Sequence, residues 1–385
     1  MDRRIVAIAA AAVLSAAGAM GGETHTGYGV TLVSGYDSNP LRVSKEGSGP
    51  EGYFGQLLLD GQVSHAAASS LTLFVDGEVR GRFHESATSD ADFGSGTVRM
   101  GLAFSPASLR KLVVGTGGRF TAYRTTYVDR ADGEVYEVRS ILDPSVTTPI
   151  GDRLDFDAAE LFLNLRWKQN EKFKLFLDTR LEETNYVEDY TATTYLEPLD
   201  FRSTTVEPGT SVQLHRAARL IFSVAYTALD YTEQSALDID GYRVEDETRS
   251  YDFTRYRLTL RVTPSRHWSV WAGARSSDRS DRYAGYYDYG SMSSYVSVDR
   301  TIGEKGKIRL YTSLSDLNYD NATVSGDLDG QTLDSEVRTV LTRYERDVRE
   351  QARWFVEGGL RRADSRDPDF TYDSDWVLGG VRFWR

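Results

Sequence analysis

Charged side chains recur at every second position in several stretches of this sequence. Arg and carboxylate groups held close together can bind an ionic or hydroxyl-rich solute through several donors and acceptors at once. The same groups can instead pair across neighbouring strands and do no more than line a water-filled space. Both interpretations stay open at this point. The candidate lining residues are Asp76, Glu78, Arg80, Glu160, Arg166, Lys174, Asp178, Arg180, Glu182, Arg257 and Arg261.

Histidine chemistry has little support in the spacing of the residues. The chain has five His, and His65, His215 and His267 fall where short turns are expected. His84 lies beside Glu85 in a longer connection, without the Ser-His-Asn or Asp-His constellation that a hydrolase needs. We therefore expect no enzyme, no catalytic residue and no cofactor.

Three acidic, Gly-containing stretches could offer carboxylate oxygens to Ca²⁺. They are 129–134, 238–241 and 327–330. None has the full spacing of an EF-hand loop, and Asp-Gly is first of all a turn signal. We expect turns here and predict no metal site, while calcium in these connections stays an open alternative.

The stretches that carry the charges alternate between apolar and polar positions. Leu161, Leu163 and Leu165 share one face of an extended strand, and charged residues occupy most of the other face. The same two-residue period recurs over 71–80, 173–182 and 256–262. Long neighbouring strands with one apolar and one charged face indicate a wall between lipid and water. The charged residues would then line the lumen of a barrel.

Connections of alternating length join these strands. Short turns join them in pairs, and longer polar stretches separate the pairs at 37–52, 84–92, 125–155, 187–200, 231–250, 319–334 and 363–371. Only the connection around 283–290 is ambiguous in length. The expected strands are 28–36, 53–63, 71–83, 97–104, 111–123, 156–167, 173–186, 201–214, 220–229, 251–262, 268–279, 292–301, 308–317, 337–348, 354–362 and 372–384.

This pattern predicts an all-β fold, a transmembrane antiparallel up-and-down barrel of about sixteen strands (roughly 14 to 18). An even number of strands places both termini on the same side. The longest connection, 125–155, is expected to lie outside the cell or to fold into the lumen.

Composition agrees with a barrel and excludes several other classes. The chain has 385 residues, no Cys and a net charge of -12, so disulfides and thiolate metal sites are excluded and a nucleic-acid partner is not expected. After the N-terminus, no apolar run approaches the roughly 18 residues of a spanning helix. A chain that crosses a membrane without such helices must close its strands into a barrel.

The N-terminus has the pattern of an export signal. Arg3 and Arg4 precede an apolar core over 5–14, and Ala17-Gly18-Ala19 supplies small residues for cleavage. A membrane anchor is the alternative, but the core is short and lacks a basic flank after it. No Cys follows the cleavage site, so a lipoprotein is excluded. We expect a cleavable signal peptide over 1–19 and one barrel domain over 20–385.

The last strand ends in the aromatic pair Phe383-Trp384, one residue before Arg385. It resembles the C-terminal signal of bacterial outer-membrane β-barrels, which normally ends on an aromatic residue, so Arg385 is a small departure. The resemblance implies the cell outer membrane of a Gram-negative bacterium. It also implies outer-membrane lipid and the barrel assembly machinery as partners.

The segment Gly35-Tyr36-Asp37-Ser38-Asn39-Pro40 closes the first expected strand. On its own it is a turn, in which Asp and Asn bond the local backbone ahead of Pro. It also resembles a motif in the first strand of barrels linked to exopolysaccharide or capsule production. That resemblance implies a porin-like conduit for export of a secreted polysaccharide, with periplasmic and inner-membrane export partners.

Two other functions compete with export. The barrel could be a general or substrate-selective diffusion porin for small hydrophilic solutes, or a structural or assembly barrel without transport. The Tyr-rich stretch 283–289 would suit stacking against sugars, or it could form the aromatic girdle at the membrane boundary. The sequence does not name the solute.

Overall fold

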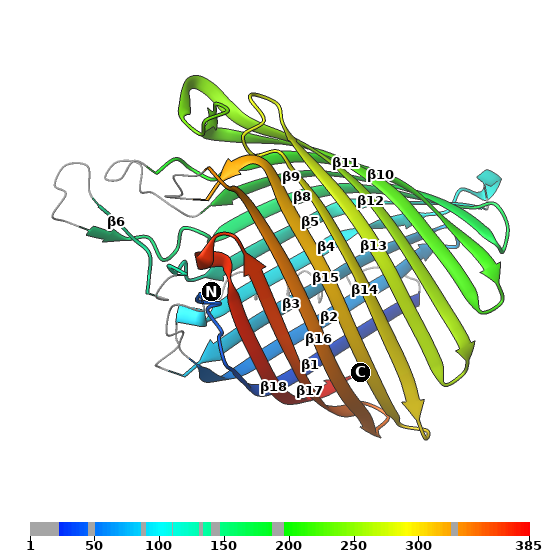
Figure 1. Ribbon diagram of the computed structural model, residues 1–385. Helices are drawn as coiled ribbons and strands as arrows, with labels where there is room; N and C mark the ends of the chain where they lie inside the picture. Colours follow the sequence, from blue (N-terminus) through cyan, green and yellow to red (C-terminus); the bar gives the residue numbers. More distant parts are fainter. Residues whose placement is uncertain are drawn as a thin grey trace.

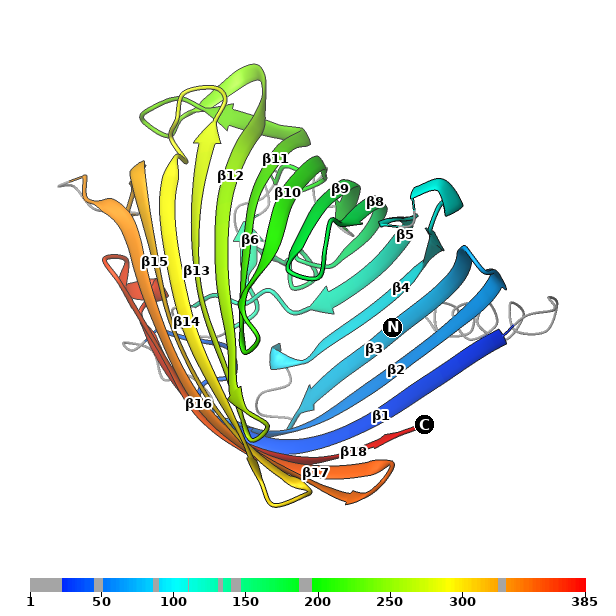
Figure 2. The ribbon, with the colours of Figure 1, turned by 90° about the vertical axis from the view of Figure 1, so that its right-hand side faces the viewer.

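The structure is a computed structural model that describes residues 23–44, 51–85, 90–109, 111–130, 134–139, 147–186, 196–324 and 330–385. The expected signal peptide, 1–19, lies outside the described residues. The described residues form one closed barrel of sixteen antiparallel strands (Figures 1 and 2). The predicted fold class is therefore confirmed.

The barrel closes where its first and last strands meet. β1 (Glu23–Asp37) pairs with β18 (Tyr372–Trp384) from Gly29 opposite Trp384 to Asp37 opposite Trp376. Beyond this ladder the N–H of Tyr28 donates to the carbonyl oxygen of Arg385 at 3.0 Å. Closure leaves no unpaired strand edge in the wall, which is what a lipid environment requires.

The other wall strands follow in chain order around the barrel. They are β2 (Gly52–Ala68), β3 (Leu71–His84), β4 (Phe93–Phe104), β5 (Leu112–Thr125), β8 (Phe156–Lys168), β9 (Phe173–Tyr186), β10 (Phe201–His215), β11 (Ala218–Leu237), β12 (Arg243–Ser265), β13 (Trp268–Asp281), β14 (Tyr289–Ile302), β15 (Gly306–Thr323), β16 (Thr332–Arg349) and β17 (Ala352–Ser365).

Short strands and 3-10 turns lie within the connections between the wall strands. β6 (Glu137–Arg139) and β7 (Thr147–Pro149) pair within the longest one, and η2 (Ala107–Leu109) and η3 (Pro368–Phe370) are single 3-10 turns. Among the described residues, no helix has the length and apolar character needed to cross a membrane. The short turns, the start of β1 and the end of β18 lie at one end, which we call the short-turn end. The longer connections lie at the long-loop end (Figure 1).

Each expected strand is present, but several extend further than the sequence predicts. The connection expected over 231–250 is wrong, because β11 and β12 continue as a paired ribbon in which Ser235 lies opposite Thr248. The connection expected over 319–334 is also shortened by β15 and β16, which pair again at Thr323 and Thr332. Outside lipid, backbone pairing needs no apolar face, so these extensions carry no alternating pattern.

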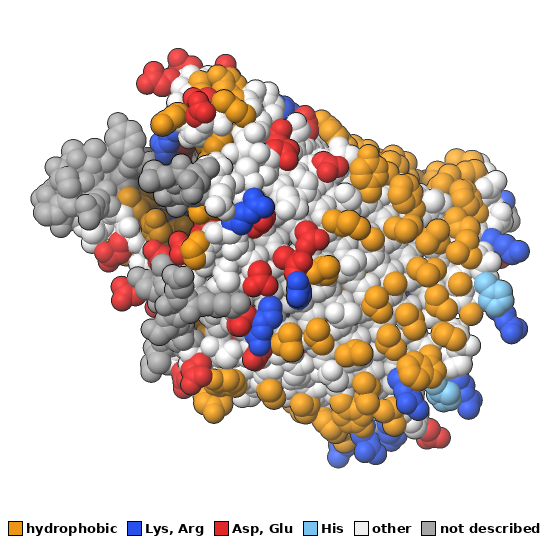
Figure 3. Space-filling model, in the orientation of Figure 1, with side chains coloured by type: hydrophobic (Ala, Val, Ile, Leu, Met, Phe, Trp, Pro, Cys, Tyr) orange, Lys and Arg blue, Asp and Glu red, His pale blue; other side chains and the backbone are white. Residues whose placement is uncertain are grey.

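The outer wall carries an apolar belt. Leu161 and Leu258 are 64% and 45% exposed on the barrel surface, and Figure 3 shows hydrophobic side chains spread over the wall toward the short-turn end. A soluble protein rarely exposes so large an apolar surface, so this belt faces lipid. Aromatic residues on the outer surface near its two borders include Phe104, Trp167, Trp268 and Phe383, and Tyr53, Phe83, Tyr226 and Tyr256, as in the girdles of membrane barrels.

Charged pairs cover the outer wall above this belt, toward the long-loop end (Figure 3). Arg282 reaches Asp252 at 2.7 Å, and Arg362 reaches Asp375 at 2.9 Å. The carboxylate of Asp252 raises the pKa of the Arg282 guanidinium. The strands thus extend beyond the hydrocarbon layer into a polar region.

Candidate functional site: the inner wall

The inner wall is formed by the residues that alternate with the apolar belt. On β12, Leu258 belongs to the belt, and the neighbouring Arg257 points inward, opposite Ser223 and Arg275. The register carries this assignment around the barrel and places the predicted residues on the inner side. They are Asp76, Glu78, Arg80, Glu160, Arg166, Lys174, Asp178, Arg180, Glu182, Arg257 and Arg261.

Several of the predicted residues form separate cross-strand or same-strand contacts rather than one site. Arg166 lies 2.7 Å from Asp178, and Glu160 lies 3.3 Å from Arg119. Arg80 contacts Glu78 at 3.3 Å on the same strand. The Thr184 hydroxyl donates to Glu182 at 3.2 Å, Arg261 lies 4.8 Å above the ring of Trp271, and Lys174 lies opposite Lys168 near the short-turn end.

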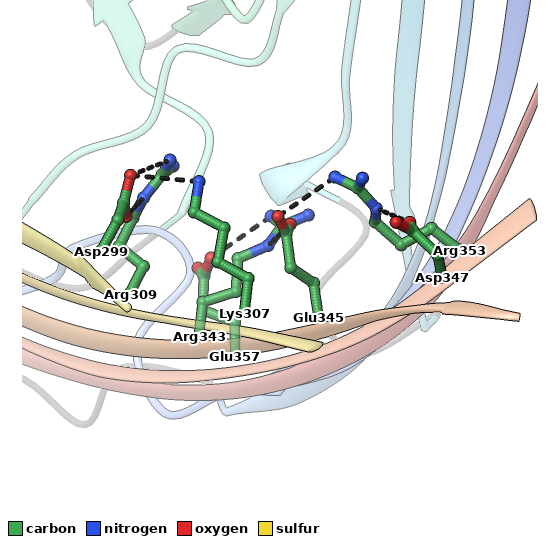
Figure 4. A network of polar contacts seen from close by, with 8 residues as sticks. All are labelled: Asp299, Lys307, Arg309, Arg343, Glu345, Asp347, Arg353 and Glu357. Atoms are coloured by element: carbon green, nitrogen blue, oxygen red, sulfur yellow. Dashed lines mark hydrogen bonds and ion pairs between the residues drawn. The ribbon is translucent and has the colours of Figure 1, made fainter. Parts of the chain in front are cut away.

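A network on β14 to β17 balances its charges (Figure 4). Asp299 accepts from Arg309 at 2.7 Å and contacts Lys307 at 3.0 Å. Further along, Arg353 bridges Asp347 at 2.6 Å and Glu345 at 3.1 Å. Arg343 lies within 3.5 Å of Glu345 and 3.6 Å of Glu357. Each carboxylate drawn there contacts at least one cation, so this section presents little net charge. We call these eight residues the balanced network.

A recess of about 850 Å³ opens into the lumen beside this network, along β1 to β5 and the neighbouring β17 and β18. Asp60, Asp76 and Glu78 contribute carboxylates to its lining, and Arg99 and Arg382 are among the cations. Arg382 contacts Asp60 at 3.2 Å. The recess therefore offers both hydrogen-bond donors and acceptors to a hydrophilic solute.

A third section, along β9 to β13, is rich in arginine. Glu207 is its central carboxylate, 8% exposed, and accepts from the Ser223 hydroxyl at 2.8 Å. Arg257 and Arg180 approach Glu207 at 3.4 Å and 3.9 Å. We call this section the arginine strip. Its basic members include Arg180, Arg255, Arg257, Arg261, Arg275 and Arg279.

Sequence reasoning missed Glu207, Arg255 and Arg275 in this section. The signal was present for Arg275, because Ala272 and Ala274 alternate with it on β13. Glu207 was harder to find, since its strand carries mainly Ser and Thr on the same face.

The aromatic stretch 283–289 lies partly on the inner side. Arg279 lies 4.3 Å above the ring of Tyr289 and 5.5 Å above that of Tyr287, and its Nε donates to the carbonyl oxygen of Tyr287 at 2.8 Å. Of the two alternatives for this stretch, the girdle therefore does not hold for Tyr287 and Tyr289, which contact the inward-facing Arg279.

The described parts of the long connection 126–155 run across the long-loop end, and Figure 1 shows β6 beyond the strands. The N–H of Ser44 donates to the carbonyl oxygen of Arg130 at 2.7 Å, near β1 and β2. Arg153 donates to the carbonyl oxygen of Glu197 at 3.2 Å, on the side of β10. Burial raises the pKa of Asp155, which accepts the N–H of Thr125. We call this connection the strap.

The segment 35–40 has a local structural role. The N–H of Asn39 donates to Asp37 at 3.0 Å, and its side-chain amide donates to the carbonyl oxygen of Asp373 at 3.0 Å. The Ser374 hydroxyl donates to Asp37 at 2.9 Å. These bonds fasten the seam between β1 and β18, so barrel closure alone accounts for these side chains.

The acidic turns and His84 form no evident site. Asp238 accepts the backbone N–H groups of Asp240 and Tyr242, as in a turn, and the described residues contain no cluster of three metal-ligating side chains. The stretches 129–134 and 327–330 lie partly outside the described residues. His84 approaches Asp92 at 3.4 Å, but its side chain is 1% exposed, so a solute cannot reach it.

A closed sixteen-stranded wall, an apolar belt outside and a charged surface inside define a transmembrane β-barrel of the outer membrane.

Comparisons with known proteins agree on the architecture and go no further. No family model matches the sequence, and no curated protein matches it. An anion-selective porin from Comamonas acidovorans is similar at 9% identity and a TM-score of 0.49, with 94% of this chain and 100% of that chain covered. OccAB1 from Acinetobacter baumannii has 9% identity and a TM-score of 0.49, with 94% and 96% covered.

A bacterial polysaccharide outer-membrane secretin is also similar, at 7% identity and a TM-score of 0.44, with 92% and 97% covered. Likenesses this distant carry no argument about the solute or the direction of transport.

Proposed function

We propose that the protein is a channel through which small hydrophilic solutes diffuse across the outer membrane. The observation that carries this proposal is the charged inner wall of a sixteen-stranded barrel. Barrels of eight strands fill their interior with side chains, whereas barrels of about 16 strands leave an aqueous channel. Side chains of both charge signs along that wall keep it wet and give a solute repeated weak contacts.

Export of a polysaccharide is the weaker alternative. It rests on the resemblance of segment 35–40, whose Asp37 and Asn39 are explained by their bonds across the seam. A structural barrel without transport would not need an inner wall that is so highly charged. Under the proposal, the expected partners are outer-membrane lipid and the barrel assembly machinery, without dedicated export partners.

The experiment is reconstitution of the purified barrel into planar bilayers and sugar-loaded liposomes. We expect stepwise ion conductance and swelling in small sugars at a rate that falls with sugar size. Heat-unfolded protein is the control and should give neither signal. A folded, inserted barrel that conducts no ions and passes no sugar would contradict the proposal.

A second arm separates export from diffusion. Deletion of the gene in its own host should slow uptake of a small hydrophilic solute and leave surface polymer unchanged. Loss of surface polymer with normal uptake would favour export instead.

A further inference from the structure

We propose that the arginine strip is a binding site for small anions such as carboxylates and phosphates. This site makes the channel pass anions in preference to cations. This inference rests on the proposed function and names the class of solute. The net charge of the whole chain, -12, would by itself predict a preference for cations.

The arginine strip carries an excess of positive charge. Arg257 and Arg275 are direct cross-strand partners, and Arg255 lies beside them on β12. Glu207 pairs with Arg257 and Arg180, and among the described residues neither Arg255 nor Arg275 forms an ion pair. Asp178, the cross-strand partner of Glu207, is paired with Arg166. Glu207 is therefore the carboxylate with which the strip forms its ion pairs, and guanidinium groups cannot lose their charge.

The guanidinium groups of the strip are accessible from the lumen. The side chains of Arg180 and Arg257 are each 46% exposed although both pair with Glu207, and Arg275 is also exposed on the inner side. Glu207 is buried beneath them, so the donors, and not the carboxylate, meet the solute. Guanidinium groups bind carboxylate and phosphate through paired N–H donors, which suits a two-oxygen anion.

The rest of the inner wall differs from the strip in how its charges are paired. The balanced network on β14 to β17 neutralises its own cations, as Asp299 does for Arg309. The strands opposite β12 and β13 in the barrel order are β2 and β3, where Asp60 pairs with Arg382 and Glu78 pairs with Arg80. Among the described residues Arg255 and Arg275 have no such ion pair, so an anion in the lumen is drawn to their side of the wall.

Exposed side chains at the strip allow the anion to leave again. Contacts in a wet lumen are screened by salt. The anion-binding site would therefore hold an anion weakly, as conduction requires. The chain's excess of carboxylates is partly accounted for by the outer wall above the belt, where Asp230, Asp252 and Asp375 lie.

The test is the reversal potential of the reconstituted barrel in a gradient of KCl. We expect the wild type to pass chloride in preference to potassium. Arg257→Gln with Arg275→Gln should lower the chloride-to-potassium permeability ratio several-fold. Inorganic phosphate should reduce the chloride current of the wild type, and this block should be lost in the double variant.

The matched control is Arg282→Gln with Arg362→Gln on the outer wall, which removes the same charge outside the lumen. It should shift the ratio much less and keep the phosphate block. Equal shifts of the permeability ratio in the two double variants, or a wild type that prefers potassium, would contradict the anion-binding site. Either result would still leave a conducting channel. No conductance in a folded wild type would instead overturn the proposed function itself. Heat-modifiable migration on gels checks that each variant is folded.

Discussion

Arg257 on β12 lies directly opposite Arg275 on β13, and only Arg257 of the two forms an ion pair, with Glu207 at 3.4 Å. Like charges directly opposite each other in a sheet are unfavourable. Arg309 also lies opposite Arg343, but each of these two has a carboxylate partner. Arg275 forms no ion pair among the described residues, so the repulsion at this position is not offset in the same way.

Stability should therefore rise when this repulsion is removed. Arg275→Gln should stabilise the folded barrel by less than about 1 kcal/mol, the size of one cross-strand charge pair. Unfolding in urea after insertion into lipid measures the change. Glu207→Gln is the opposite case and should destabilise the barrel, because Arg180 and Arg257 lose their shared carboxylate. A loss of stability in Arg275→Gln would show that its charge helps to hold the wall.

The two faces of the wall should respond differently to charge. Leu163→Arg places a cation against lipid and should cost about 2–4 kcal/mol near the bilayer midplane. Arg261→Leu removes an inward cation that has an aromatic contact with Trp271, so it should cost less and alter conductance. Folding titrations into lipid vesicles measure both changes. Equal folding defects would mean that the faces are misassigned.

Glycine is needed where aromatic rings cover the inner wall. A side chain at Gly117 would collide with the carbonyl oxygen of Met100 and with the ring of Phe162. Gly117→Ala should therefore destabilise the barrel by about 1–3 kcal/mol through overpacking. Gly96→Ala is the control, because a Cβ there meets nothing within 4 Å. The yield of the heat-modifiable form measures both, and equal yields would contradict this packing.

The strap should be held close to the loop between β1 and β2. Ser44→Cys with Arg130→Cys should form a disulfide under mild oxidant, since the backbones meet at 2.7 Å and the chain has no other Cys. Ser44→Cys with Ile239→Cys is the control, with Ile239 between β11 and β12, and should stay reduced. A gel without reductant reports the bridge. No bridge in the first pair would place the strap elsewhere.

The wall could be predicted from sequence because lipid and water impose a two-residue period. Leu161, Leu163 and Leu165 against Glu160 and Arg166 are enough to assign two faces, and this pattern recurs around the barrel. Where both faces are polar the period disappears, which explains why the paired ribbon at Ser235 and Thr248 was expected to be a loop.

The partners on the inner wall could not be predicted in the same way. The convergence of Arg180 from β9 and Arg257 from β12 on Glu207 depends on the register of four strands. Sequence spacing does not fix that register, because each long connection allows several alignments. The fastening of Asn39 to Asp373 across the seam is equally remote in sequence.

One side of the barrel wall faces a water-filled lumen and the other faces lipid. Arg257→Cys and Leu258→Cys test it on neighbouring residues of one strand, in a protein without other Cys. The measurement is labelling of each variant, folded in liposomes, by a charged thiol reagent that does not enter lipid. We expect rapid labelling at 257 and protection at 258. Labelling at 258 with protection at 257, or equal reactivity at both, would contradict it.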